Sequence, residues 1–387
     1  MRIFLDGRVL IGRNFGGVGE YARLLFENLL KSAPADEFIL WLNSFRDKQE
    51  VVDYWQEKFP NLRIIENRWP NRLFDLTNGF LNGPKIDKKI SADVFYSPHF
   101  NILSLATPRK RILTVHDLSF IHFPEFFSWR DNLYHGRQFL TKQFRAAEKI
   151  VAVSDFTAWD LAETFKLPAE KIIRIHSGIN PIFRRLAVGE ILDVSAEIRQ
   201  MTETRPFILI AGTTLEPRKN HIALIKAFNH LKTKPIFKDF ALVIAGPKGW
   251  LFEDIFKEAG SSPFAVDIRF LGSVSDNNLV WLYNNAAVFA YPSFFEGFGF
   301  PPLEAQACGL PVVASNRSSL LEILGDSALL VDPWRIGELA EALEAVLTKD
   351  SLRQDLIKRG LVNVKRFDWQ KTADGFLGLF RSLKSLE

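Results

Sequence analysis

Short runs of β-branched and other apolar residues alternate with longer amphipathic stretches along the whole chain. This alternation is typical of parallel β-sheets whose strands are joined by helical crossovers. It predicts an α/β fold of two Rossmann-like, doubly wound parallel sheets. The expected strands begin near Arg2, Phe38, Leu62, Val94, Ile112, Ile150 and Ile172 in the first half, and near Phe207, Leu242, Ile268, Val288, Pro311 and Leu329 in the second.

The length of 387 residues predicts two domains, because a single hydrophobic core rarely grows past about 250 to 300 residues. We expect an N-terminal Rossmann-like domain at residues 1–185 and a C-terminal one at 205–367. The stretch 186–204 holds no good strand and is the expected linker. The last segment, 368–387, carries Trp369, Phe376 and Phe380 at helical spacing, so we expect a helix that packs on the N-terminal domain.

Charge and composition narrow the functional class. The net charge is +4, but Lys and Arg are interleaved with Asp and Glu rather than gathered into the dense basic stripe of a nucleic-acid-binding protein. The single cysteine, Cys308, rules out an internal disulfide and suggests a reducing compartment. Asp6 and Arg8 interrupt any signal-peptide core, and no apolar run reaches the roughly 18 to 20 residues that span a bilayer. We expect a cytoplasmic protein.

Aromatic and basic residues between positions 126 and 145 leave two interpretations open. One is peripheral contact with the inner face of a membrane, and the other, which we favour, is an ordinary amphipathic helix with a solvated face. The residues concerned are Phe126, Phe127, Trp129, Arg130, Arg137, Lys142 and Arg145.

The most informative stretch is 293–305, which follows the expected strand at 288–291. Its glycines suit close approach of the backbone to a ligand, and Pro301 and Pro302 suit the first turn of a following helix. A helix N-terminus is a ready anion site. Glu296 in the loop and Glu304 in the expected first turn would place one carboxylate at a sugar and the other at a ribose. Alternatively, Glu304 complements the helix dipole and Glu296 is a turn residue.

Glu296 and Glu304, separated by seven residues, resemble the Glu-x7-Glu motif of family 4 retaining glycosyltransferases of the GT-B fold. The segments 307–315 and 329–333 continue the pattern of that family. The resemblance implies that Glu296 contacts the donor sugar and Glu304 the donor ribose. It also implies that the loop amides from Gly297 through Phe298 to Gly299 hold sugar and phosphate.

A second signal is the segment 211–220, directly after the first strand of the second half. Gly212 precedes a loop that ends in Arg218 and Lys219, just before an expected helix, where fixed cations would neutralise a diphosphate. The alternative is a pair of solvated surface cations. The sequence Glu-Pro-Arg-Lys-Asn is similar to the diphosphate-binding segment of the family. Where many members have an arginine after the glycine, this chain has Thr213.

Four further residues follow from the same resemblance. Gly16 and Gly17 lie in a segment similar to the glycine-rich loop of the first domain, which approaches donor phosphate and acceptor. His116 resembles the histidine beside the transferred sugar, although a lone histidine after a strand is often structural. Gly272 ends a strand of the nucleotide half, where loop backbone would hold the base. The dinucleotide-like spacing at Gly17 begins too far from its strand to indicate NAD.

The resemblance implies transfer of a hexose from a nucleotide diphosphate sugar with retention, and Glu296, His116, Lys219 and Arg218 are the expected catalytic group. We expect GDP-mannose first and a UDP-hexose second, with a glycan on a lipid carrier as acceptor. No Asp-x-Asp pair and no zinc-like cluster occurs, so we expect neither metal nor cofactor.

Three other classes remain open at this point. A GT-B epimerase or phosphorylase would consume donor without an acceptor. A non-catalytic nucleotide-sugar-binding protein would never release free nucleotide. An NAD-dependent oxidoreductase would change the absorbance of a nicotinamide cofactor.

Overall fold

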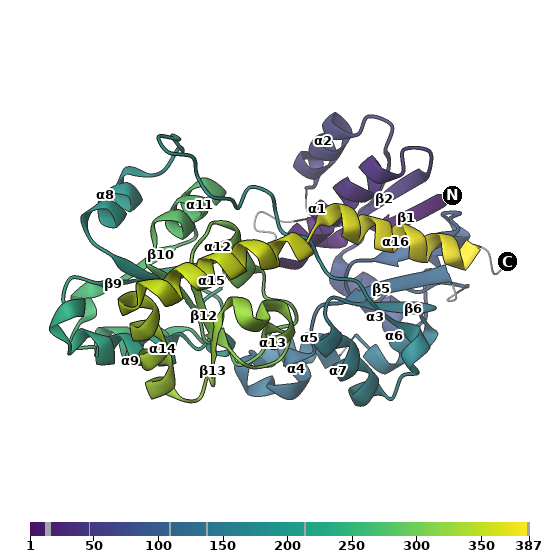
Figure 1. Ribbon diagram of the computed structural model, residues 1–387. Helices are drawn as coiled ribbons and strands as arrows, with labels where there is room; N and C mark the ends of the chain where they lie inside the picture. Colours follow the sequence, from purple (N-terminus) through teal and green to yellow (C-terminus); the bar gives the residue numbers. More distant parts are fainter. Residues whose placement is uncertain (12–16, 46, 108–109, 137, 213, 385–387) are drawn as a thin grey trace. The chain divides into compact units, whose positions relative to one another are not determined.

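The computed structural model describes residues 1–11, 17–45, 47–107, 110–136, 138–212 and 214–384. The chain divides into two compact units, each of which is described by itself (Figure 1). Unit 1 comprises residues 1–118, 129–178 and 368–387. Unit 2 comprises residues 119–128 and 179–367.

Among the described residues of unit 1, seven parallel strands form one sheet in the order β3-β2-β1-β4-β5-β6-β7. Its strands are β1 Arg2–Asp6, β2 Glu37–Asn43, β3 Arg63–Asn67, β4 Val94–Ser97, β5 Arg111–Val115, β6 Lys149–Ala152 and β7 Ile172–Arg174. Its helices are α1 Gly17–Ser32, α2 Gln49–Lys58, α3 Asn71–Phe80, α5 Trp129–Gly136, α6 Leu140–Ala146, α7 Asp155–Phe165 and α16 Trp369–Lys384.

Among the described residues of unit 2, six parallel strands form a sheet in the order β10-β9-β8-β11-β12-β13. Its strands are β8 Phe207–Ile210, β9 Ala241–Ala245, β10 Ile268–Gly272, β11 Val288–Tyr291, β12 Val312–Ser315 and β13 Leu329–Val331. Its helices are α4 Ser119–His122, α8 Ala196–Thr204, α9 His221–Lys232, α10 Glu253–Gly260, α11 Asp276–Asn285, α12 Phe300–Ala307, α13 Leu320–Leu324, α14 Ile336–Thr348 and α15 Asp350–Asn363.

Both sheets have the doubly wound order, so the predicted fold class is confirmed. Every expected strand begins within one residue of its observed start. The central strands β8, β9, β11 and β12 are buried along their whole length, as continuous apolar runs are when helices cover both faces of a parallel sheet. In unit 2, α9 packs on α10 and α14, while α12 packs on α11 and α15.

The divisions between the units differ from the expected domain bounds. The chain passes into unit 2 after Gly178 rather than after residue 185, and the segment 119–128 also belongs to unit 2. The expected linker, 186–204, contains α8, because Arg199 lies over the Trp281 ring and Thr202 accepts a hydrogen bond from the indole. The C-terminal helix α16 belongs to unit 1, where it packs along α1.

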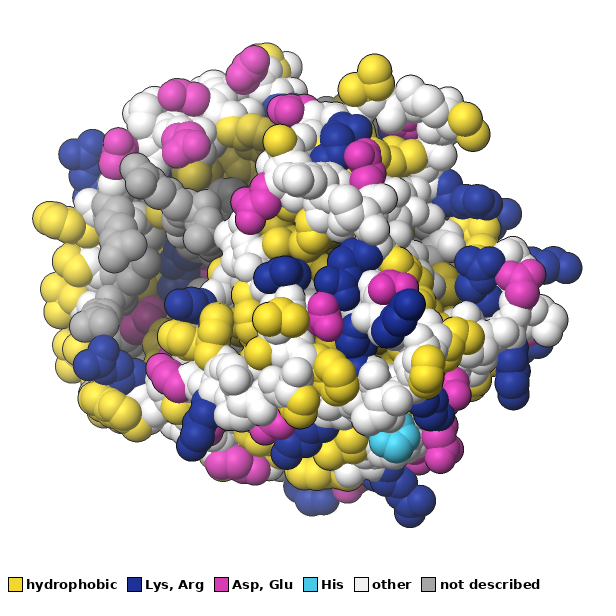
Figure 2. Space-filling model, turned by 90° about the vertical axis from the view of Figure 1, so that its left-hand side faces the viewer, with side chains coloured by type: hydrophobic (Ala, Val, Ile, Leu, Met, Phe, Trp, Pro, Cys, Tyr) yellow, Lys and Arg dark blue, Asp and Glu magenta, His cyan; other side chains and the backbone are white. Residues whose placement is uncertain are grey.

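Two properties of the described residues bear on whether the chain binds nucleic acid or crosses a membrane. On the face drawn in Figure 2, Lys and Arg side chains are mixed with Asp and Glu side chains rather than forming one continuous basic area. Among the described residues, no helix is both long and apolar enough to cross a membrane.

Candidate functional site

The strand order of unit 2 reverses between β8 and β11, which are neighbours in the sheet. At such a switch point, the connections that follow the two strands leave toward opposite faces, and ligands bind in the crevice between them. The segment after β8 runs through Gly212 to the 3-10 turn η6, Pro217–Lys219. The segment after β11 runs from Pro292 to Gly299. Both segments that the sequence singles out therefore lie at the carboxyl edge of adjacent strands.

A charged cluster joins these two segments. The ammonium of Lys219 donates to Glu296 Oε1 at 2.7 Å and to the Tyr291 hydroxyl at 2.9 Å. The guanidinium of Arg218 donates to Glu296 Oε2 at 3.1 Å and to Glu216 Oε1 at 2.7 Å. Two cations and two carboxylates thus alternate within one hydrogen-bonded group, which fixes the position of Glu296 from both sides.

Electrostatics keep Glu296 ionised. Burial acts to raise its pKa, but the charges of Lys219 and Arg218 outweigh burial and lower the pKa to about 2. Burial and the charge of Arg218 lower the pKa of Lys219, and Glu296 opposes this shift. A carboxylate with so low a pKa accepts hydrogen bonds from sugar hydroxyls at neutral pH and does not serve as a general acid.

The loop after Glu296 is built on a position that requires glycine. Gly299 has φ +108°, and a Cβ there would lie 2.6 Å from the Leu320 side chain. Helix α12 begins at the next residue, with Pro301 and Pro302 in its first turn, as predicted. The N-terminus of α12 therefore follows directly on the loop that carries Glu296.

Gly297 and Phe298 are part of a closed loop. The Ser319 hydroxyl, which has one proton to donate, lies within hydrogen-bonding distance of the carbonyl oxygens of Glu296 and Phe298, at 2.9 and 3.0 Å. The Phe298 ring is 5% exposed and meets the Phe367 ring edge to face at 5.5 Å. The Phe298 side chain is therefore a packing group, and only the backbone of this loop remains suited to the expected ligand contact.

Glu304 lies in the second turn of α12 and not in the first turn as expected, because the helix begins at Phe300. Its Oε2 accepts a hydrogen bond from the Tyr283 hydroxyl at 3.0 Å. The same oxygen would lie 3.2 Å from a Cβ added to Gly212, whose φ is +69°. The structure thus brings Glu304 beside the exposed backbone of Gly212, at the end of β8.

Two other predicted glycines, Gly272 and Gly17, lie at the ends of elements. Gly272 has φ +66° at the end of β10, and its carbonyl accepts from the Gly246 N–H at 2.8 Å. Gly17 is the first residue of α1 in unit 1, and a Cβ there would meet nothing within 4 Å. Gly16 and Thr213 lie outside the described residues.

His116 follows β5 in unit 1. Its Nε2 lies 2.8 Å from the Pro98 carbonyl oxygen, so Nε2 carries the proton and donates it. Its ring meets Tyr21 edge to face at 4.7 Å and stacks with His99 at 6.2 Å. Burial lowers the pKa of His116, and the Pro98 carbonyl and the charge of Asp117 oppose this shift. Burial also lowers the pKa of His99, to about 3. His116 is therefore neutral at pH 7, with Nδ1 as an acceptor.

A charged pair, Asp6 and Arg8, also lies at the end of β1 in unit 1, but both of its side chains are buried. The Arg8 guanidinium donates twice to Asp6, at 2.9 and 2.7 Å, and once to the Ile102 carbonyl oxygen at 3.1 Å. It also lies 5.3 Å from the centres of the Trp41 and Phe74 rings. The side chains of Arg8 and Asp6 are 5% and 4% exposed, so this pair is a structural part of the unit.

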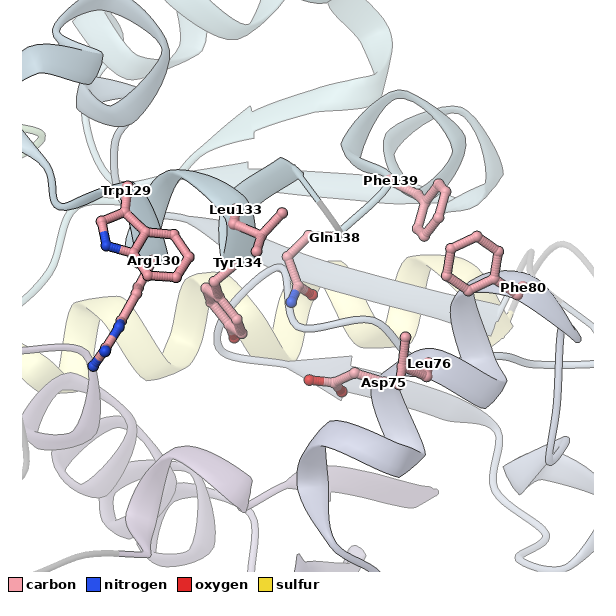
Figure 3. A pocket seen from close by; sticks show the side chains of 9 residues that line it. All are labelled: Asp75, Leu76, Phe80, Trp129, Arg130, Leu133, Tyr134, Gln138 and Phe139. Carbon is pink, nitrogen blue, oxygen red and sulfur yellow. The ribbon is translucent and has the colours of Figure 1, made fainter.

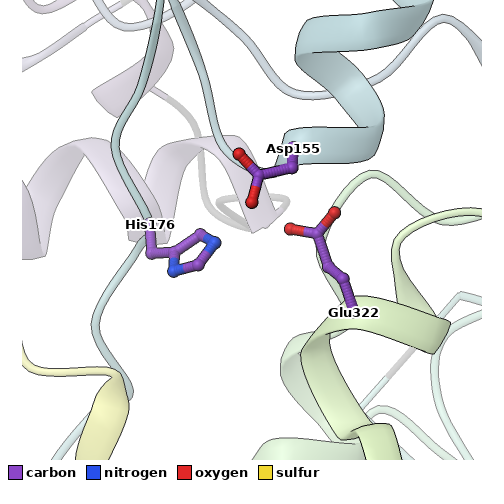
Figure 4. A group of neighbouring side chains, drawn as sticks. All are labelled: Asp155, His176 and Glu322. Atoms are coloured by element: carbon purple, nitrogen blue, oxygen red, sulfur yellow. The ribbon is translucent and has the colours of Figure 1, made fainter.

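Figure 4 draws Asp155, His176 and Glu322, which carry the ligand types of metal sites. Asp155 and His176 belong to unit 1, whereas Glu322 lies on α13 of unit 2. Asp155 opens α7, where a carboxylate complements the helix dipole, and it accepts from Arg174 Nε at 3.0 Å. Asp155 thus has a structural role, and the absence of a metal remains a prediction.

Two residues of the site, Tyr291 and Ser318, have no place in the sequence motifs. Tyr291 ends β11, and its hydroxyl accepts a hydrogen bond from Lys219. The hydroxyl of Ser318 accepts the Glu296 N–H at 2.8 Å. The signal for Tyr291 was a hydroxyl-bearing residue at the last position of an otherwise apolar strand. Ser318 gave no such signal, because its contact spans 22 residues of chain.

Two family models match the chain. The model of the glycosyl transferases group 1 matches residues 195–362, and the model of glycosyltransferase family 4 matches residues 15–182. The chain is 31% identical to the O-antigen chain mannosyltransferase B of Escherichia coli over 75% of this chain and 73% of that protein. It is 29% identical to the serotype-specific mannosyltransferase WbdA of the same species, over 72% of this chain but only 35% of WbdA.

Solved structures share the fold at lower identity. Sucrose-phosphate synthase from Thermosynechococcus elongatus has a TM-score of 0.75 at 19% identity and covers 100% of both chains. The Anabaena protein HepE, solved with UDP and glucose, has a TM-score of 0.74 at 19% identity, over 99% of this chain and 100% of HepE. Both likenesses concern the fold.

Proposed function

The chain belongs to the family 4 glycosyltransferases of the group 1 type, and on this premise we propose that it transfers mannose from GDP-mannose to a glycan acceptor in the synthesis of a surface polysaccharide. That it is a hexosyltransferase follows from the family. The proposal of mannose rests on the similarity to the O-antigen and serotype-specific mannosyltransferases. The acceptor that we propose is a growing, lipid-linked glycan.

The observation that carries the proposal is the cluster of Lys219, Arg218 and Glu296 at the switch point of unit 2. In the transfer step, the glycosidic bond to the diphosphate breaks and the leaving oxygen gains negative charge. Lys219 and Arg218 hold positive charge at a fixed place without reorganisation, which stabilises that developing charge. Phosphate oxygens of the donor would accept charge-assisted hydrogen bonds from these two cations.

We assign Glu296 the orientation of the donor sugar. Its low pKa keeps it ionised, and its two oxygens are each held by a cation. We further propose retention, with the acceptor oxygen attacking from the side of the leaving group while the acceptor hydroxyl proton passes to the leaving phosphate oxygen. Neutral His116 would accept a hydrogen bond from a sugar hydroxyl at Nδ1, and the Glu304 carboxylate would accept from the donor ribose.

No divalent ion is needed in this proposal, because the two cations and the N-terminal amides of α12 neutralise the diphosphate. The test is nucleotide release from a panel of GDP- and UDP-hexoses with methyl α-mannoside as acceptor, in the presence of EDTA. We expect release of GDP from GDP-mannose and an α-linked product by NMR.

Other outcomes are separable in the same assay. Release of UDP from a UDP-hexose, with no release of GDP, would show that the donor is not GDP-mannose, and the protein would still be a hexosyltransferase. Binding of a donor without any release would point to a nucleotide-sugar-binding protein and contradict transfer. Activity that disappears with EDTA would contradict metal independence.

A further inference from the structure

Unit 1 contains a pocket of about 590 Å³, which lies within the range of roughly 300 to 1,000 Å³ typical of small-ligand sites (Figure 3). It opens between α3 and α5, with the start of the α6 segment at one end. Its lining consists of Asp75, Leu76, Phe80, Trp129, Arg130, Leu133, Tyr134, Gln138 and Phe139.

The pocket lies at the edge of the sheet where ligands are expected. Helix α3 follows β3, and α5 lies between β5 and β6. The Tyr134 hydroxyl donates to Asn101 Oδ1 at 2.8 Å, and Gln138 Oε1 accepts the Ile102 N–H at 2.9 Å. Since Asn101 and Ile102 belong to the connection after β4, the pocket is anchored beyond the carboxyl ends of several parallel strands.

The lining combines aromatic faces with polar groups. Trp129 and Phe80 are 70% and 69% exposed, and the Arg130 guanidinium lies over the Trp129 ring at 5.3 Å. Asp75 presents a carboxylate that Arg8 approaches at 3.6 Å. The C–H face of a pyranose packs against the negative face of an aromatic ring, while its hydroxyls bond to carboxylate, amide and guanidinium groups.

An aliphatic chain or a phosphate fits this lining less well. A hydrocarbon occupant would leave the Asp75 carboxylate without replacement for the water that it loses. A phosphate would meet the negative charge of Asp75. Burial raises the pKa of Asp75, with Asp6 adding to the rise and Arg8 opposing it. A neutral ligand rich in hydroxyl groups avoids both penalties.

One aromatic wall is held in a strained conformation. Phe139 has φ +49°, which is uncommon for a residue with a bulky side chain. Its ring lies over α3, where a Cβ added to Gly79 would be 2.6 Å from Phe139 Cε2. The Phe139 ring also meets Phe80 edge to face at 5.4 Å. The absence of a side chain at Gly79 therefore determines the shape of this wall.

A chain of ring contacts relates the pocket to His116. Ring centres are separated by 5.5 Å between Tyr134 and His135 and by 6.0 Å between His135 and Phe100. They are separated by 4.0 Å between Phe100 and His99 and by 6.2 Å between His99 and His116. Three aromatic rings thus stand between Tyr134 and His116, so a ligand in the pocket lies several rings away from the expected place of the transferred sugar.

We propose that the pocket between α3 and α5 binds an internal sugar residue of the acceptor glycan, one that does not react. This inference rests on the proposed function, because it takes the acceptor to be a carbohydrate. It gives the enzyme a preference for acceptors long enough to reach from the reacting sugar to Trp129.

The test compares two acceptors at saturating GDP-mannose. Methyl α-mannoside is too short to fill both the place of the reacting sugar and the pocket. A linear α-linked trimannoside, in contrast, extends toward the pocket. We expect the wild type to have a lower KM for the trimannoside. The variant Trp129→Ala raises that KM about tenfold, leaves kcat nearly unchanged, and leaves the KM of methyl α-mannoside unchanged. Trp159→Ala on α7 is the matched control, since Trp159 is 60% exposed and does not line the pocket.

A second variant and a binding measurement keep the outcomes distinct. Gly79→Ala displaces the Phe139 ring and should also raise the trimannoside KM. If Trp129→Ala and Gly79→Ala leave that KM unchanged while the wild type turns over, the pocket assignment is wrong and the proposed function stands. If no donor releases nucleotide but trimannoside binding, followed by NMR, is lost in Trp129→Ala and kept in Trp159→Ala, the transfer proposal is wrong and the pocket remains a sugar site.

Discussion

The two sheets have the same type of strand order, but the residues at their carboxyl edges differ in charge. In unit 2 the edge carries Lys219 and Arg218, which both form ion pairs with the buried Glu296. In unit 1 the edge carries His116 and His99, whose pKa values are lowered, beside the buried Asp6–Arg8 pair, whose charges offset each other. The same type of fold thus carries two different sites. The charged edge of unit 2 suits a diphosphate, and the largely neutral, aromatic edge of unit 1 suits an uncharged sugar.

The largest effect is expected from removing the central cation. Lys219→Ala leaves the Glu296 carboxylate, 6% exposed, with one cation fewer, and breaking such a buried pair costs about 3–5 kcal/mol of unfolding free energy. Chemical denaturation measures this loss. The double variant Lys219→Met/Glu296→Gln should recover much of the stability without recovering turnover. Equal stability of the single variant and the wild type would contradict the ionic description of this edge.

Glu296→Gln tests the orienting role. The amide keeps the shape but loses the charge that holds Lys219 and the sugar hydroxyls, so kcat should fall on the order of a hundredfold, as for loss of a preorganised transition-state contact. GDP affinity, measured by calorimetry, should change little. Glu258→Gln on α10 is the control, because Glu258 forms an ion pair with the surface residue Lys226 at 3.7 Å. Parallel loss of kcat and GDP binding would instead indicate damage to the loop.

Gly212→Ala tests whether the donor site of unit 2 needs a residue without a side chain at the end of β8. The residue has φ +69°, and its new Cβ would lie 2.8 Å from the Tyr283 hydroxyl. We expect a loss of about 1–3 kcal/mol in stability and weaker donor binding. Gly260→Ala, at the end of α10, meets nothing within 4 Å and should be neutral or slightly stabilising. A neutral Gly212→Ala would show that close approach of backbone is not required there.

The smallest effect concerns the neutral edge of unit 1. Burial and the nearby His116 lower the pKa of His99 from 6.5 to about 3. Between these values the unfolded chain binds the proton and the folded chain does not, so stability is lost as pH falls below about 6.5, by up to about 1.4 kcal/mol per pH unit for this group. Denaturation of His99→Leu between pH 7 and pH 5 should show a shallower slope than the wild type. An identical slope would mean that His99 is charged in the folded protein.

Much of the fold was predictable because parallel strands buried on both faces appear as continuous apolar runs, and all of them were found in the sequence. The motif residues Glu296, Arg218 and Lys219 were singled out by their resemblance to the family motifs and by their position after such strands, and their roles stay predictions. Their mutual pairing was not predicted, because Lys219 and Glu296 are 77 residues apart and only the strand order brings β8 beside β11. The helix α8 was missed because its sequence 196–204 contains a single fully buried position, Ile198.

The central claim is that the Lys219–Arg218–Glu296 group binds the donor diphosphate without a metal. Calorimetric titration of the full chain with GDP-mannose in EDTA tests it, with Lys226→Ala as the control, a lysine on α9 that is 46% exposed. The account predicts binding by the wild type and by Lys226→Ala, and an affinity lower on the order of a hundredfold for Lys219→Ala. Binding that requires Mg²⁺, or that survives Lys219→Ala unchanged, would contradict it.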